Sequence, residues 1–151
     1  MDLITLRESI RRHEGSRDLP YRDTVGLWTI AIGHLVDDDP LPFGAATVGD
    51  VLDYITDRER HAQWLEDDIE IAIKGARDWL GDAFTQLSEP AQRVIVEMAY
   101  QLGGAGLAKF VQMRAALVAF NMGLAADCGL NSKWATQTPH RAKELMATLR
   151  G

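Results

Sequence analysis

Two carboxylic side chains stand in local settings that should give them opposite charge states. Glu14 precedes Gly15, where the first helical pattern of the chain ends. The negative end of a helix dipole disfavours a carboxylate, so this position favours a protonated, proton-donating group. Asp23 lies in a turn-forming stretch with Gly26, where backbone N–H groups and water can keep it ionised. Such a pair can hydrolyse a glycosidic bond, although each residue type at such a position is more often a surface or structural residue.

The spacing of apolar residues around these carboxyl groups changes along the chain, which indicates a change of secondary structure. Apolar residues recur at intervals of three and four over residues 3–12, which predicts a short amphipathic helix. Farther on, apolar residues alternate with smaller ones, as in a strand, at Trp28, Ile30 and Ile32. We therefore expect a small β-hairpin over residues 19–33, followed by a polar loop at 37–42.

A long helix is predicted over residues 57–80. Thr56 and Glu59 form a capping box at its start, and Gly81 stands where it should stop. The apolar residues of its expected buried face are Ala62, Leu65, Ile69, Ala72, Ile73, Ala76 and Leu80.

Further helices occupy the rest of the chain. Ser88 opens one of them, and Gly103 and Gly104 should close it. Shorter helices follow, and Thr138 before Pro139 predicts the cap and first residue of the last helix. Its expected buried residues are Leu145, Met146 and Leu149.

These elements predict an α+β fold in which a small β-hairpin lobe and a helical lobe are joined by a long helix, with a cleft between the lobes. The length of 151 residues fits one domain. The expected parts are a hairpin lobe at about 14–56, a linking helix at about 57–80, and a helical lobe at about 81–151 together with the helix at 3–12.

Composition and charge exclude several classes of protein. The net charge of −6, with an acidic middle and a basic carboxyl-terminal part, argues against a nucleic-acid partner. The single cysteine, Cys128, cannot form an intrachain disulfide, and nothing near it in sequence activates it as a nucleophile. The four histidines lack metal-ligand spacing, so we expect no metal and no cofactor, with His13 and His61 solvated on the surface.

Several segments resemble the phage lysozymes of the T-even kind. The family spacing of a glutamate, eight residues, an aspartate, five residues and a threonine is matched by Glu14, Asp23 and Thr29. The segments that carry the resemblance are His13-Glu14-Gly15, Tyr21-Arg22-Asp23-Thr24, Gly26 to Leu35, Ser132-Lys133-Trp134 and Gln137 to Ala142.

The resemblance implies a lysozyme-like fold and a muramidase, with peptidoglycan as its substrate. Glu14 would be the general acid, Asp23 would activate the water, and Thr29 would help to hold that water. The better-known relatives invert the anomeric centre, so we expect the two carboxyl groups to be about 6.5–9.5 Å apart.

Further residues take expected roles from the same resemblance. Leu35, Tyr100 and Gln101 match positions that line the sugar cleft, although simple packing is an equally good interpretation. We expect Arg141 to approach Glu14 in a salt bridge that orients its carboxylate. His34 and Asp68 should form a buried or half-buried ion pair that ties the hairpin to the long helix and contributes most at mildly acidic pH.

The amino-terminal residues do not follow the pattern of a signal peptide, and no apolar stretch is long enough to span a membrane. The resemblance therefore suggests a monomeric phage endolysin, made in the cytoplasm of the bacterial host, that lyses the host from within. It would reach the wall after release, with a separate holin-like factor for delivery.

Two alternatives remain open. The first is a lysozyme-like module that binds the wall, or serves as a structural part of a phage tail, with little activity. The second is a lytic transglycosylase, which needs an acid but no water-activating partner. The presence of Glu14, Asp23 and Thr29 together argues against the first alternative, and Asp23 argues against the second.

Overall fold

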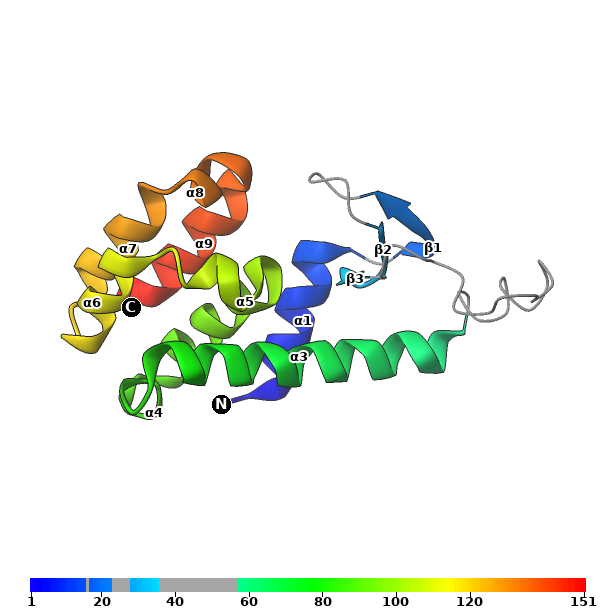
Figure 1. Cartoon of the computed structure of the whole chain (residues 1–151), viewed down its shortest axis with the longest axis horizontal. Coiled ribbons are helices and arrows are strands. Elements are labelled where there is room, and N and C mark those ends of the chain that lie inside the picture. Colours follow the sequence, from blue (N-terminus) through cyan, green and yellow to red (C-terminus); the bar gives the residue numbers. More distant parts are fainter. Residues whose placement is uncertain (16, 23–27, 36–56) are drawn as a thin grey trace. The chain divides into compact units, whose positions relative to one another are not determined.

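The computed structural model describes residues 1–15, 17–22, 28–35 and 57–151 (Figure 1). Helices make up most of these residues, and three short strands form one small sheet. The chain divides into two compact units. One unit is Arg7–Asp68, and the other combines Met1–Leu6 with Ile69–Gly151.

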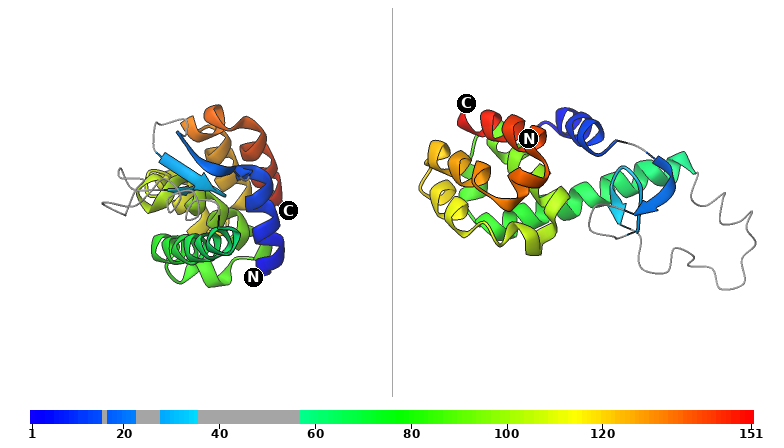
Figure 2. Two further views of the ribbon diagram at one scale, coloured as in Figure 1. Left: turned by 90° about the vertical axis from the view of Figure 1, so that its right-hand side faces the viewer. Right: turned by 90° about the horizontal axis from the view of Figure 1, so that it is seen from above.

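The unit Arg7–Asp68 contains most of one helix, a sheet and the first half of a long helix. These elements are α1 (Leu3–Glu14), β1 (Arg17–Arg22), β2 (Trp28–Ala31), β3 (His34–Leu35) and α3 (Arg58–Leu80). The strands pair antiparallel in the order β1-β2-β3 and lie beside the amino-terminal half of α3 (Figure 2). Both α1 and α3 also extend into the second unit.

The second strand is shorter than its sequence pattern suggested. The alternation predicted a strand that includes Ile32, but β2 ends at Ala31. Ile32 and Gly33 instead form a tight turn into β3, in which Gly33 has a φ of +75°. Glycine adopts this left-handed conformation without a steric penalty, so the turn reverses the chain where the alternating pattern alone would continue it.

The ends of α1 and α3 follow ordinary capping chemistry. Gly15, with a φ of +71°, ends α1, and Gly81, with a φ of +61°, ends α3, as predicted. The carboxylate of Asp57 accepts hydrogen bonds from the backbone N–H groups of Glu59 and Arg60, at 2.9 and 3.2 Å. Asp57 therefore caps α3, whereas the predicted cap, Thr56, lies outside the described residues.

The buried face of α3 differs from the prediction at one end. Five of its predicted residues are buried: Leu65, Ile69, Ala72, Ala76 and Leu80. Ile73 is half-buried, and Ala62 is exposed, so that assignment was wrong. His61 is buried instead, because it precedes Leu65 by four residues and so shares its face of the helix.

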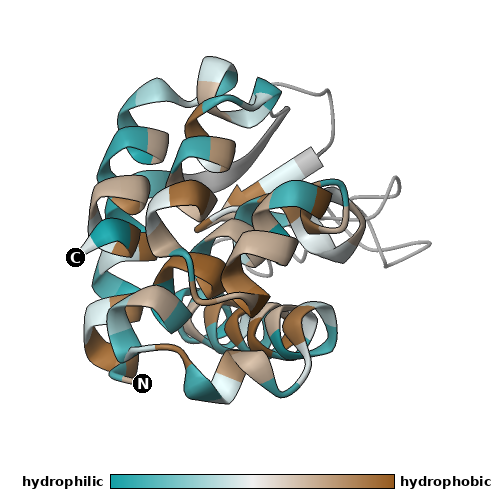
Figure 3. Ribbon diagram, turned by 90° about the vertical axis from the view of Figure 1, so that its left-hand side faces the viewer, coloured by the Kyte–Doolittle hydropathy of each residue, from teal (hydrophilic) through white to brown (hydrophobic). Residues whose placement is uncertain are grey.

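The second unit is helical. Besides the second half of α3, it contains α4 (Ala83–Gln86), α5 (Glu89–Leu107), α6 (Val111–Val118), α7 (Met122–Leu130), α8 (Lys133–Gln137) and α9 (Pro139–Arg150). Helix α9 packs against α5, α7 and α8, and α6 packs against α7. The hydrophobic stretches of these helices gather toward the middle of the unit (Figure 3). Its fully buried large side chains include Phe84, Ile95, Met98, Leu107, Met113, Leu117 and Met146.

One predicted helix end is confirmed, and one predicted cap needs correction. Gly103, with the non-helical φ +65° and ψ 169°, divides α5 at a kink, so the helix that Ser88 opens closes there as predicted, and a second helical stretch runs on to Leu107. Thr138 does not cap α9 with its side chain, because its hydroxyl group donates to the carbonyl of Trp134 at 3.1 Å. The predicted cap at Ser88 is confirmed, since its hydroxyl accepts from the backbone N–H of Ala91. The predicted buried residues of α9 are also buried: Leu145, Met146 and Leu149.

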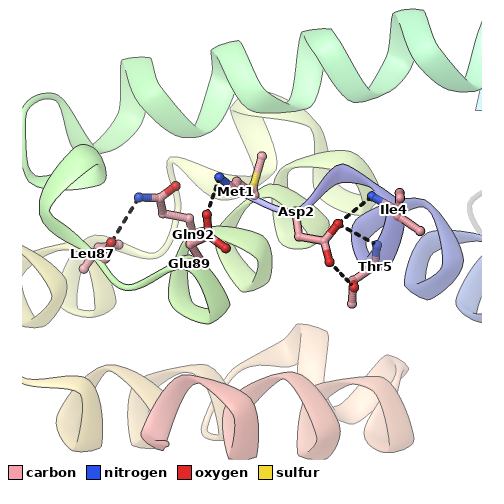
Figure 4. A network of polar contacts seen from close by, with 7 residues as sticks. All are labelled: Met1, Asp2, Ile4, Thr5, Leu87, Glu89 and Gln92. Carbon is pink, nitrogen blue, oxygen red and sulfur yellow. Dashed lines mark hydrogen bonds and ion pairs between the residues drawn. The ribbon is translucent and has the colours of Figure 1, made fainter.

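Polar contacts hold the first residues of the chain within the helical unit (Figure 4). The amino group of Met1 lies 2.7 Å from the carboxylate of Glu89 on α5. Asp2 accepts hydrogen bonds from the hydroxyl of Thr5 and from the backbone N–H groups of Ile4 and Thr5. The Thr5 hydroxyl, followed by these N–H groups, holds the pKa of Asp2 below its ordinary value. Asp2 therefore caps α1.

Candidate active site

Glu14 is the last residue of α1, and its side chain lies against the turn between β2 and β3. A Cβ atom added to Gly33 would be 3.3 Å from both Cγ and Oε2 of Glu14. Gly33 therefore serves two purposes. It allows the left-handed backbone of the turn, and it leaves room for the Glu14 carboxyl group. Glu14 itself is half-buried at this position.

Thr29 lies on β2, in the same unit as Glu14, and only 5% of its surface is exposed. Its backbone pairs with Tyr21 of β1 and Leu35 of β3, which makes it a residue of the central strand. Asp23 lies outside the described residues, so its expected separation from Glu14 stays a prediction.

The predicted contact between His34 and Asp68 is confirmed. Nδ1 of His34 lies 2.8 Å from Oδ2 of Asp68, and the two side chains are 24% and 23% exposed. The pair joins β3 to α3, and both residues belong to the unit Arg7–Asp68. Because solvent reaches only about a quarter of each side chain, this pair should be screened less than one on an open surface.

A double-mutant cycle on this pair should reveal coupling. We expect His34→Asn and Asp68→Asn each to lower the free energy of unfolding, with a double mutant less destabilised than the sum. The coupling should be about 0.5–3 kcal/mol, as for other residues in direct contact. Thermal melts of the wild type, the two single variants and the double variant provide the measurement.

The matched control is Asp67→Asn, because Asp67 is an exposed acid on the same helix whose carboxylate accepts from Gln63 at 2.8 Å. Asp67→Asn should show no coupling to His34→Asn. Additive effects of His34→Asn and Asp68→Asn would contradict the charge coupling that we expect.

Two aromatic residues beside this pair were not recognised from the sequence. Trp64 stacks on His34, with ring centroids 4.6 Å apart and ring planes inclined by 5°. His61 stacks on Trp64 at 5.5 Å and 21°, and it is only 7% exposed, so the expectation of a solvated His61 was wrong. The spacing of His61, Trp64 and Asp68 by three and four residues places them on one face of α3 and was the available signal.

A second ion pair joins α1 to α3 within the same unit. Nε and Nη2 of Arg7 donate to Oε1 and Oε2 of Glu66, each at 2.6 Å, which is the two-pronged geometry of a strong arginine–carboxylate pair. Hydrogen bonding to Arg7 is the main cause that holds the pKa of Glu66 below its ordinary value, with the charges of Arg7 and Arg11 acting in the same direction. Burial opposes this shift and is the second-largest cause, after the hydrogen bond to Arg7.

This pKa shift predicts how stability depends on pH. A depressed carboxyl pKa contributes stability that is complete above the unfolded pKa of about 4.3 and is lost as the pH falls through the lower folded value. Glu66→Gln should therefore lower the melting temperature at neutral pH and have less effect as the pH approaches 3. The side chain of Glu66 is 40% exposed, so the effect should be at most about 1 kcal/mol.

Melting temperatures of the wild type and Glu66→Gln between pH 3 and pH 7 test this expectation. The control is Glu70→Gln, an exposed acid on the same helix, which should change little at any pH. A Glu66→Gln effect that stays constant over the whole range would mean that the ion pair does not contribute through its charge.

The remaining predicted site residues lie in known elements, but their roles stay predictions. Gln101 accepts a hydrogen bond from Nε1 of Trp134 at 2.7 Å, and this contact links α5 to α8. Tyr100 is half-buried on α5, and Arg141 is buried on α9, with 8% of its surface exposed. Leu35 belongs to β3. The contact expected between Arg141 and Glu14 stays a prediction, because the two residues belong to different compact units.

Metal-binding clusters and membrane-spanning helices are both absent from the described residues. Over those residues, no cluster of three or more His, Cys, Asp or Glu side chains is arranged to hold a metal ion. Within the same part of the chain, every helix is too short or too polar to cross a membrane.

Comparison with known proteins identifies the family. The sequence model of the family Phage lysozyme matches residues 11–144, which includes Glu14 and Thr29. The chain therefore belongs to the phage lysozyme family.

Two relatives differ in the share of their own length that matches this chain. The chain is 31% identical to the pre-baseplate central spike protein Gp5 of Enterobacteria phage T4, over 94% of this chain but 27% of that protein. It is 23% identical to a Dictyostelium discoideum protein named "Probable T4-type lysozyme 2", over 95% of this chain and 92% of that protein. The chain thus spans about a quarter of the spike protein and nearly all of the second relative.

Proposed function

We propose that this protein is a muramidase that hydrolyses the β-1,4 bond between N-acetylmuramic acid and N-acetylglucosamine in bacterial peptidoglycan. The observation that carries the proposal is the family match over residues 11–144, in which Glu14, Asp23 and Thr29 keep the spacing of the phage lysozymes. Membership in this family supports peptidoglycan as the substrate.

In the proposed reaction, Glu14 is the general acid that protonates the leaving glycosidic oxygen. Its position supports this role, because it ends α1 and its half-buried side chain lies against Gly33. Asp23 is the base that activates the attacking water, and Thr29 helps to hold that water. A single displacement by water inverts the anomeric centre. We include Leu35, Tyr100 and Gln101 as residues that contact the sugar chain.

We propose that the protein acts in the life cycle of a phage. A monomeric endolysin that causes host lysis would need a holin-like factor to reach the wall. The identity to a central spike protein supports a second setting, in which a lysozyme domain belongs to the phage particle and opens the wall from outside. Under that alternative, the domain could also be mainly structural, with little activity.

Hydrolysis of purified peptidoglycan tests the proposed function. The wild-type chain should lower the turbidity of a peptidoglycan suspension and release new reducing ends. Mass spectrometry of the fragments should find reducing N-acetylmuramic acid. Anhydro-sugar ends would mean a lytic transglycosylase, and binding to the wall without any release of fragments would mean a structural module.

A further inference from the structure

Trp64 contacts the part of the sheet that carries the candidate site. Its indole ring lies flat on the imidazole of His34, at 4.6 Å and 5°, and packs against the buried residues Ile30 and Ala31 of β2. Ile30 and Ala31 are 1% and 2% exposed. One side chain of α3 therefore contacts both strands that flank the turn at Gly33.

We propose that Trp64 is a positioning residue for the proposed hydrolysis, holding the β2–β3 turn in the place where it supports Glu14. This inference rests on the proposed function. Trp64 acts through its neighbours, so it differs in kind from Glu14, Asp23 and Thr29. The phage lysozyme match does not by itself assign this role.

The imidazole ring of His34 is held in two directions. Asp68 holds Nδ1 within the plane of the ring at 2.8 Å, and Trp64 covers the face of the ring. A hydrogen bond alone allows the ring to tilt about its donor–acceptor axis. A parallel aromatic neighbour opposes this tilt, because tilting would lose the stacking contact.

A fixed position of His34 also fixes the position of Gly33. The two residues are adjacent in the chain, and the backbone of His34 pairs with Ile30 across the turn. Gly33 then bounds the space of the Glu14 carboxyl group, whose Cγ and Oε2 lie 3.3 Å from the place of a Cβ. Loss of the stacking between Trp64 and His34 should therefore let Gly33 move. The position of the Glu14 carboxyl group beside it would then be less well defined.

The need for a flat ring distinguishes the positioning role of Trp64 from simple packing. A residue that only fills space against Ile30 and Ala31 could be replaced by another apolar side chain of similar reach. A residue that holds His34 by stacking needs a flat ring. Trp64→Phe keeps a ring, whereas Trp64→Leu and Trp64→Met keep apolar contact without one.

The experiment measures kcat and KM on soluble, uncrosslinked peptidoglycan strands, at a temperature below the melting point of every variant. Trp64→Leu and Trp64→Met should lower kcat by about tenfold to hundredfold, since small displacements of a catalytic group have effects of this size. Their KM should change little, because Trp64 is not expected to touch the sugar. Trp64→Phe should keep most of kcat.

One control variant and one spectroscopic measurement accompany the kinetics. Trp79→Leu removes another half-buried tryptophan of α3 and should leave kcat unchanged apart from any loss of stability. The imidazole proton resonances of His34, assigned by their loss in His34→Asn, should move in Trp64→Leu and Trp64→Met, because the indole ring current no longer acts on them. This second readout does not depend on catalysis.

Each possible result either supports or overturns the positioning role of Trp64. Equal kcat for the Leu, Met and Phe variants, or His34 resonances that do not move, would overturn the positioning role while the proposed function stands. An effect on KM alone would also overturn it. If the wild type and Trp79→Leu release no fragments at all, the proposed function fails, and the positioning role fails with it. If Trp64→Leu does not fold, Trp64→Met and Trp64→Phe carry the comparison.

Discussion

Replacing Glu14 by glutamine should abolish glycan hydrolysis while leaving the fold intact. The amide has nearly the shape of the acid but cannot donate a proton to the leaving oxygen. General acid catalysis typically contributes about a hundredfold to ten-thousandfold to the rate, so the remaining activity should lie near the limit of detection. The release of reducing ends from purified peptidoglycan measures the loss, and a thermal melt checks the fold.

The matched control is Glu8→Gln, which makes the same change at an exposed position of α1. Glu8→Gln should keep full activity, and both variants should melt close to the wild type. If Glu14→Gln retained activity within a few-fold of the wild type, another group would have to supply the proton, and the role proposed for Glu14 would be wrong.

The local signals of the sequence predicted the helices well. Gly15 and Gly81 end α1 and α3, and Ser88 caps α5, because each effect depends on the backbone within a few residues. Gly103 likewise divides α5 at a kink, where the predicted helix closes. The same kind of signal failed at Thr138, whose hydroxyl donates to the carbonyl of Trp134 and does not cap α9. A threonine hydroxyl can bond several nearby backbone groups, so its presence before a helix does not fix which bond it makes.

Contacts between distant segments were harder to predict. The pair of His34 with Asp68 was expected only through the family resemblance, since nothing in the spacing of two residues 34 positions apart predicts contact. Trp64 and His61 were missed for the same reason. Their shared helix face could be read from the sequence, but the sheet that covers that face could not.

Replacing Gly33 by alanine should affect both stability and activity. Its φ of +75° lies in the left-handed region, where an alanine costs about 1–2 kcal/mol relative to glycine. The added Cβ would also stand 3.3 Å from Cγ and Oε2 of Glu14, so the acid would have to move by a few tenths of an ångström. We expect kcat to fall about tenfold to hundredfold, in addition to a lower melting temperature.

Two further variants separate backbone strain from contact with Glu14. Gly81→Ala has the same kind of strain, with a φ of +61°, but its new Cβ would meet no atom within 4 Å, so it should lose stability and keep its activity. Gly33→Asn relieves part of the strain, because asparagine tolerates the left-handed region, but it still adds a Cβ beside Glu14. Gly33→Asn should therefore melt higher than Gly33→Ala and yet remain poorly active. Full activity of Gly33→Asn would mean that the turn does not constrain the acid.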